Sequence, residues 1–127
     1  MTLRDARIAA RIPVRDLAAA RAWYSEKLGL EPAEERPGGL RYEFANGEFA
    51  LFESSGTSSG DHTQMGWEVD DFQATIEELQ SRGVSFEEYG ITVVEGNYPS
   101  KGGRGEHAAW FRDLDGNLFG LGQPIRD

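Results

Sequence analysis

The strongest constraint on the fold of this sequence is an internal repeat. Residues 14–29 (VRDLAAARAWYSEKLG) and residues 69–83 (VDDFQATIEELQSRG) each begin with a valine that is followed two residues later by aspartate, continue as an apolar helical pattern and end at glycine. Residues 46–51 (NGEFAL) and residues 115–120 (DGNLFG) match in the same way. Each half therefore reads as a strand, a helix and a strand meander. Because one half is too small to bury both faces of its own sheet, we expect the two to pack side by side.

The first half, about residues 7–53, contains clear start and stop signals for a helix. Asp16 is typical of an N-cap residue, whose carboxylate accepts backbone N–H bonds, and Gly29 suits the left-handed residue that ends a helix. These signals predict a helix over residues 17–28. Strands are predicted at residues 7–14, 40–44 and 48–53, the last two joined by the hairpin dipeptide Asn46-Gly47. A Ser- and Gly-rich linker is predicted at residues 54–61.

The second half, about residues 62–123, repeats this pattern. Asp70 or Asp71 is expected to cap a helix that runs to Arg82, and Gln73 is placed to form a capping box with Asp70. The buried face of this helix is predicted to carry Phe72, Ile76 and Leu79. Strands are predicted at residues 64–69, 84–86, 91–94, 107–112 and 118–121, with a loop at residues 96–105.

Composition narrows the range of partners. The net charge of −9 at pH 7 disfavours nucleic acid, because an acidic surface repels phosphates, and it favours a cationic small molecule. No apolar run approaches the roughly 18 residues of a membrane span, and the N-terminus does not resemble a signal peptide. The absence of cysteine excludes disulfides and thiol chemistry and is compatible with the expected cytoplasmic location.

Two stretches, IAARIPVRDLAAARAWYSEKLGLEP and AAWFRDLDGNLFGL, resemble the vicinal oxygen chelate superfamily. That superfamily includes glyoxalase I, extradiol dioxygenases, fosfomycin-resistance proteins and bleomycin-resistance proteins. The resemblance covers essentially the whole chain and implies one α+β domain over residues 1–127. Two βαβββ modules would form a curved mixed-sheet cup with helices outside. The resemblance also implies a homodimer, and it leaves open whether the cup forms within one chain or between two.

The metal-containing members place a His, Gln or Glu ligand at each of four positions. Two lie five residues before the valine that precedes each helix, and two lie four residues after each turn glycine. In this chain those positions hold Ala9, Gln64, Leu51 and Gly120. Only Gln64 carries an atom that can bind a metal, and a divalent ion usually needs three or more suitable ligands. We therefore predict no metal site of the usual kind and no cofactor.

Side chains alternate along a strand, so residues with the parity of Ala9 and Gln64 are predicted to line the cleft. They are Arg11, Phe49, Leu51, Glu53, Gln64, Gly66, Glu68, Leu118 and Gly120. Arg11 and Glu68 are expected on neighbouring strands. There they would form either a charged pair that orients a polar ligand or a buried pair that satisfies itself.

The large aromatic residues are assigned by element. Trp23 and Tyr24 lie on the first predicted helix, where core packing is expected, and Trp67 should pack under the second helix. Trp110 is a candidate for the cleft, although its register is ambiguous by one residue. Tyr98 lies in the long loop before the last hairpin, and we expect it to act as an aromatic lid.

Neither histidine matches a metal-ligand position. His62 lies at the edge of the linker and His107 begins a strand, so a surface or rim role is predicted for both. His107 with Lys101 and Arg104 could still line the mouth of the cleft and receive an anionic group. The KGGRG stretch lacks the spacing of a phosphate loop and reads as a Gly-rich lid or a plain hairpin connection.

The function predicted first is metal-independent binding of a small molecule, cationic or aromatic, similar to bleomycin-resistance-type members that sequester drugs. The alternative is a glyoxalase-like lyase or isomerase, or a dioxygenase-type enzyme, with an atypical site or with Glu68 or Glu53 as general base. A third hypothesis is a scaffold or regulatory role with an empty cleft. Whether the chain is an enzyme is left open.

Overall fold

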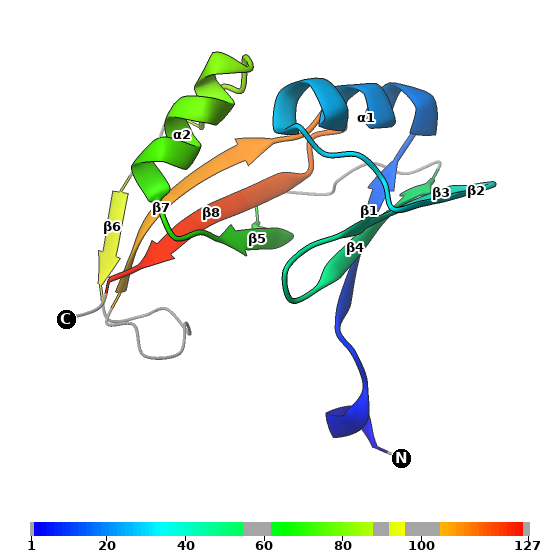
Figure 1. Cartoon of the computed structure of the whole chain (residues 1–127), viewed down its shortest axis with the longest axis horizontal. Coiled ribbons are helices and arrows are strands. Elements are labelled where there is room, and N and C mark those ends of the chain that lie inside the picture. Colours follow the sequence, from blue (N-terminus) through cyan, green and yellow to red (C-terminus); the bar gives the residue numbers. More distant parts are fainter. Residues whose placement is uncertain (1, 55–61, 88–91, 96–104, 126–127) are drawn as a thin grey trace. The chain divides into compact units, whose positions relative to one another are not determined.

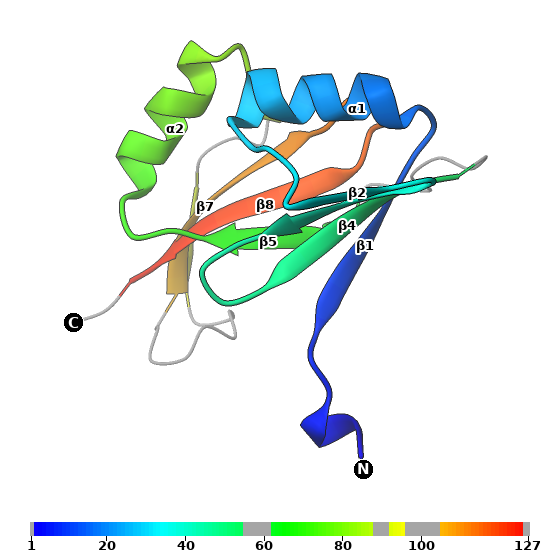
Figure 2. The same ribbon diagram turned by 45° about the vertical axis from the view of Figure 1, so that its right-hand side comes forward.

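The sequence repeat corresponds to two βαβββ units in the structure, a computed structural model that describes residues 2–54, 62–87, 92–95 and 105–125. The chain divides into Met1–Thr57 and Ser58–Asp127, and each unit has one four-stranded mixed sheet and one main helix. Figures 1 and 2 show both units from two sides. The fold class is therefore α+β, as predicted.

The sheet of the first unit has the strand order β1-β4-β3-β2, with β1 parallel to β4 and the other neighbours antiparallel. A short 3-10 turn precedes it, and one turn of π-helix extends the main helix. The elements are η1 (Leu3–Asp5), β1 (Ala9–Val14), α1 (Leu17–Trp23), η2 (Tyr24–Leu28), β2 (Glu34–Arg36), β3 (Gly39–Glu43) and β4 (Glu48–Glu53).

The helix of the first unit begins and ends where its sequence signals predict. The carboxylate of Asp16 accepts a hydrogen bond of 3.0 Å from the backbone N–H of Ala19, as an N-cap does. Gly29 follows η2 with a φ of 70°, a left-handed conformation that glycine adopts without steric cost. The predicted single helix is therefore α1 extended by η2.

The core of the first unit lies between this helical segment and one face of the sheet. Tyr24 is fully buried and its ring lies 5.8 Å from that of Tyr42 and 6.0 Å from that of Phe49. Ile12 and Leu51 pair across β1 and β4 and are buried in the same layer. The core role predicted for Tyr24 is confirmed, and Trp23 packs edge-on against it.

The second unit repeats the arrangement with the order β5-β8-β7-β6, and β5 is parallel to β8. In place of the predicted strand at residues 84–86, Phe86 makes one isolated bridge to Phe111. The elements are β5 (Met65–Glu68), α2 (Phe72–Ser81), β6 (Thr92–Glu95), β7 (Gly105–Arg112) and β8 (Leu118–Pro124).

Asp71, and not Asp70, caps the helix of the second unit. Its carboxylate accepts a hydrogen bond of 3.0 Å from the N–H of Ala74. The predicted capping box is therefore wrong, and Gln73 instead donates to Glu77 one turn further along α2. The predicted buried face of α2 is confirmed, and the helix is followed by Gly83 with a φ of 93°.

The core of the second unit packs between α2 and its sheet. Trp67 stacks on Phe111 with their rings 6.0 Å apart and meets Phe119 edge-on, so it packs against buried rings of β7 and β8. The turn before β8 is held by Asp113, whose carboxylate accepts bonds from two backbone N–H groups and from the side chain of Asn117. No helix in the described part of the chain is long and apolar enough to cross a membrane.

Candidate functional site

In each unit the helix covers one face of the sheet, and we call the opposite face the helix-free face. On the second unit, neighbouring strands place Gly66, Gly120 and Trp110 side by side on this face. Gly66 pairs with Gly120 across β5 and β8, and Gly120 pairs with Trp110 across β8 and β7. The flanking residues of β7, Ala109 and Phe111, are buried on the helix side. The register of Trp110 is thus fixed, and its role in binding stays a prediction.

The indole of Trp110 lies across the bare backbone of Gly120. Its Nε1–H donates a hydrogen bond of 3.0 Å to the hydroxyl of Thr63. A Cβ built on Gly120 would lie 3.3 Å from that Nε1 atom and 3.5 Å from the methyl of Thr63. Because 3.3 Å is tighter than ordinary van der Waals contact, a side chain at Gly120 would require the indole to shift by a few tenths of an ångström. The indole of Trp110 therefore covers the position where a side chain at Gly120 would lie.

Gln64 uses its side-chain oxygen within its own unit. The backbone N–H of Leu118 donates to Oε1 of Gln64 at 3.3 Å, and the backbone N–H of Gln64 donates to the carbonyl of Leu118 at 2.9 Å. These two contacts tie the start of β5 to the start of β8. Oε1 of Gln64 is the atom among the four predicted ligand positions that could bind a metal. It already accepts a hydrogen bond from the backbone.

The helix-free face of the first unit carries a charged cluster centred on Arg41. Its guanidinium binds the carboxylates of Glu34 at 2.9 Å, Glu43 at 2.6 Å and Glu48 at 3.1 Å. The hydrogen bond from Arg41, and a second from Arg36, hold the pKa of Glu34 below its usual range. The bonds to Glu43 and then Glu34 raise the pKa of Arg41 above its ordinary value. Both shifts favour the charged forms of Glu34 and Arg41.

A cavity of about 380 Å³ lies beside this cluster. Arg11, Ala50, Arg41 and Glu34 form a row across β1, β4, β3 and β2, because each is paired with the next in the strand register. All four line the cavity. Arg11 was predicted from the sequence and Arg41 was not, although the alternation of Leu40, Arg41 and Tyr42 along one strand could have indicated it.

The prediction that Phe49, Leu51 and Glu53 face the cleft is wrong. Leu51 is fully buried beside Ile12 on the helix-covered face, and Phe49 and Glu53 share its parity. The physical reason is a one-residue difference between the two hairpins. In the first unit β4 begins directly after Gly47, whereas in the second β8 begins two residues after Gly116. Ala50, and not Leu51, is therefore the counterpart of Gly120.

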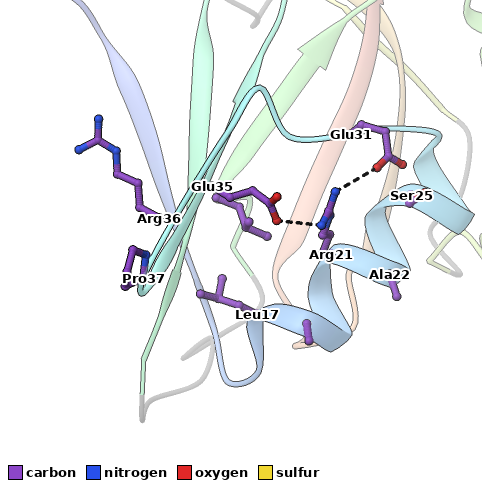
Figure 3. A pocket seen from close by; sticks show the side chains of 10 residues that line it. Leu17, Arg21, Ala22, Ser25, Glu31, Glu35, Arg36 and Pro37 are labelled. Carbon is purple, nitrogen blue, oxygen red and sulfur yellow. Dashed lines mark hydrogen bonds and ion pairs between the residues drawn. The ribbon is translucent and has the colours of Figure 1, made fainter.

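A second, larger hollow of about 760 Å³ lies between α1 and the edge strand β2 of the first unit. Figure 3 shows Arg21 reaching from α1 toward two carboxylates along its rim. Its guanidinium binds Glu35 at 2.8 Å and lies 3.8 Å from Glu31. Apolar side chains including Leu17, Ala22 and Pro37 line the rest, which makes this an open surface groove on the helix side.

The residues at the four ligand positions do not fit the divalent ion of the metal-containing family members. With the hairpin offset corrected they are Ala9, Ala50, Gln64 and Gly120, and the oxygen of Gln64 is hydrogen-bonded to the backbone. Within the described ranges, no group of three or more His, Cys, Asp or Glu side chains is arranged to hold a metal ion. The four positions therefore offer too few ligand atoms to hold such an ion.

The other residues predicted for the site lie on exposed surfaces or outside the described residues. Arg11 and Glu68 are both exposed and lie in different units, so their pairing stays a prediction. Both His62 and His107 are exposed, in agreement with a surface role, and the ring of His107 lies 5.9 Å from that of Phe72. The lid residue Tyr98 lies outside the described residues, as do Lys101 and Arg104.

The two βαβββ units define an α+β protein of a known architecture. The model of the Glyoxalase/Bleomycin resistance protein/Dioxygenase superfamily matches residues 6–121. The chain belongs to this superfamily. Among curated protein sequences, none matches it significantly.

Solved structures of the same architecture cover nearly the whole chain. A glyoxalase/bleomycin resistance protein/dioxygenase from Alicyclobacillus acidocaldarius is 20% identical with a TM-score of 0.73, over 100% of this chain and 97% of that one. TnmS3, an antibiotic binding protein from Streptomyces sp. CB03234, is 25% identical with a TM-score of 0.65, over 95% and 97%. A lactoylglutathione lyase from Agrobacterium tumefaciens is 19% identical with a TM-score of 0.66, over 94% and 93%.

Proposed function

We propose that this protein binds a small aromatic molecule and does so without the divalent ion of the metal-dependent family members. The observation that carries the proposal is the indole of Trp110 lying across Gly120. A position at which those members hold a metal ligand has no side chain here, and an aromatic ring covers it. Such a ring offers a flat surface for stacking and no donor atom for a metal.

Two further observations support this class of ligand. TnmS3, a structural relative at 25% identity, is described as an antibiotic binding protein. The net charge of −9 favours ligands with a positive charge, and a cation can also bind the face of an indole. The ligand class that we propose is therefore a planar aromatic compound, with cationic members of that class favoured.

The first test measures metal content and ligand binding together. Untagged protein purified without chelator is analysed for bound metals and then titrated calorimetrically with planar aromatic compounds that differ in charge. We expect less than stoichiometric metal, and binding that weakens about three- to tenfold in Trp110→Ala. The matched control is Trp23→Phe, which alters an indole on α1 and should leave affinity unchanged. Near-stoichiometric zinc, nickel, manganese or iron would overturn the proposal and favour the enzyme.

The enzyme and scaffold alternatives gain no specific support from the described residues. Glu53 and Glu68, the candidates for a general base, are both exposed at strand ends. The likeness to the lactoylglutathione lyase concerns the fold. Binding of none of the aromatic compounds would favour the scaffold hypothesis instead.

We also propose that the protein acts as a homodimer in the cytoplasm. The dimer rests on the family resemblance, and the location rests on the lack of cysteine. Light scattering coupled to size-exclusion chromatography tests the dimer, for which we expect twice the chain mass of 14.1 kDa. A monomer across the accessible concentration range would contradict it.

A further inference from the structure

The cavity on the helix-free face of the first unit has an arginine that no carboxylate among the described residues of its own unit binds. The guanidinium of Arg11 makes one long contact, 3.4 Å from Nη1 to the carbonyl of Ala10. Since a guanidinium has five N–H donors, most of its hydrogen-bonding capacity is open to a ligand.

The neighbouring carboxylates cannot readily turn to Arg11, because they are already engaged. Glu34, Glu43 and Glu48 all bind Arg41, and Glu34 also binds Arg36 at 2.5 Å. Arg41 is likewise engaged, through Nε and Nη1, by its three partners. The cluster thus occupies the carboxylates of this face, and the guanidinium of Arg11 keeps donors for a ligand.

The charges around the cavity balance, whereas the whole chain carries −9. The lining holds Arg11, Arg36 and Arg41 against Glu34 and Glu48, and Glu43, which binds Arg41 from beside the lining, brings the sum to zero. All three carboxylates bind Arg41, so within this set the charge of Arg11 has no partner. A singly charged anionic group suits it, while the nearby carboxylates disfavour a multiply charged one.

The size of the cavity and the residue between the two arginines suit a small ligand. Ala50 separates Arg11 from Arg41 in the cross-strand row, and its methyl leaves a shallow space between the longer side chains. A volume of about 380 Å³ lies at the lower end of the range for small-molecule sites. Arginine binds a carboxylate through two parallel N–H bonds, a geometry that matches this single negative charge.

We propose that this cavity binds the carboxylate of a small organic molecule through the guanidinium of Arg11. Arg41 is a positioning residue that keeps the carboxylates of the cluster away from Arg11. The proposal goes beyond the proposed function, because its residues all lie in the first unit and exclude Trp110, and because it names an anionic group where the aromatic site favours a cation.

The test uses benzoate and its neutral isostere benzamide, titrated into ¹⁵N-labelled protein and followed by amide chemical shifts. We expect benzoate to shift the backbone amides around Arg11 and Ala50, and benzamide to have little effect on those amides. Affinity for benzoate should fall about tenfold in Arg11→Gln. It should recover in part in Arg11→Lys, which restores the positive charge but not the two parallel N–H donors of a guanidinium. The matched control is Arg7→Gln, which removes one exposed arginine just outside β1 and should bind as wild type.

Each contrary result overturns the proposal. Benzamide binding as tightly as benzoate would show that charge is not recognised, and equal benzoate affinity in Arg11→Gln would assign the anion elsewhere. No shift with benzoate up to its solubility limit would exclude the site. Inorganic phosphate binding more tightly than benzoate would show a general anion site instead. A titration of Trp110→Ala in parallel separates the two proposals, because benzoate binding at Arg11 should be unchanged in it.

Discussion

Trp110 and Gly120 lie opposite each other on β7 and β8, and the indole nitrogen comes within 3.3 Å of the place where a Cβ on Gly120 would lie. The two positions are therefore coupled, because a side chain at Gly120 would require the ring to move by a few tenths of an ångström. In the family pattern the same strand position carries a metal ligand. At Gly120 the metal ligand of the family pattern is absent, and the indole of Trp110 covers the position. A larger side chain at Gly120 tests this relationship.

Gly120→Val should force the indole of Trp110 away from its contact with Thr63. Overpacking at such a site typically costs about 1–3 kcal/mol of unfolding free energy, which urea denaturation measures. The matched control is Gly47→Ala, because nothing lies within 4 Å of a Cβ at Gly47. In a Trp110→Ala background the valine should cost less. An equal cost in both backgrounds would contradict the dependence of one residue on the other.

Arg41→Gln should destabilise the first unit more at neutral pH than in acid. Without Arg41, Glu34, Glu43 and Glu48 face one another as like charges. In the wild type the pKa of Glu34 is lowered by Arg41 and Arg36, so its contribution to stability is present above pH 4.5 and is lost as the pH falls through the lowered value.

The difference in melting temperature between wild type and Arg41→Gln should therefore narrow below pH 4.5. Arg21→Gln, which breaks the exposed pairs with Glu35 and Glu31, should change stability little at either pH. A gap that stays constant from pH 7 to pH 3 would show that the loss is one of packing and not of charge.

Tyr42→Phe should leave stability unchanged or raise it by up to about 1 kcal/mol at neutral pH, because the Tyr42 hydroxyl is buried without a hydrogen-bond partner in the structure. Burial raises the pKa of Tyr42 to about 12. The unfolded chain ionises near pH 10, so the wild type should lose stability relative to the variant as the pH rises from about 10 to 12. Chemical denaturation at pH 7 and pH 11 checks both statements. If the stability difference between wild type and Tyr42→Phe is the same at both pH values, the burial argument is contradicted.

Asp71→Ala should lower the unfolding free energy by about 1 kcal/mol, the usual cost of losing an N-cap. Asp70→Ala is a matched control, since the neighbouring carboxylate is not the cap, and its effect should be smaller. Urea denaturation of both variants decides between them. A larger effect at Asp70 would restore the capping box predicted from the sequence.

Much of each unit could be predicted from the sequence, because local chemistry determines it. The caps at Asp16 and Asp71, the glycines that end the helices and the apolar face of α2 all depend on residues close together in the chain. The choice between Asp70 and Asp71 failed because both satisfy the same local pattern. Only the position of the first helical turn separates them.

The site was harder to predict, because it depends on strand pairing. One residue of difference between two hairpins moved Leu51 from the predicted cleft into the core, since every side chain changes face when the register shifts by one. The contact of Trp110 with Thr63 joins residues far apart in the chain, and no local pattern indicates it. Arg41 was missed because its role appears only when β2, β3 and β4 lie side by side.

The parallel ladders of the two sheets have a consequence for the order in which the chain can fold. In each unit the first strand pairs with the last, so that Ala9 meets Glu48 and Met65 meets Phe119. During synthesis, β5 has no partner in its own unit until β8 has emerged from the ribosome. The first unit can close its sheet much earlier. A chain cut just before Leu118 would thus lose the strand that holds β5 and β7 together, and the remaining strands would present open edges to other molecules.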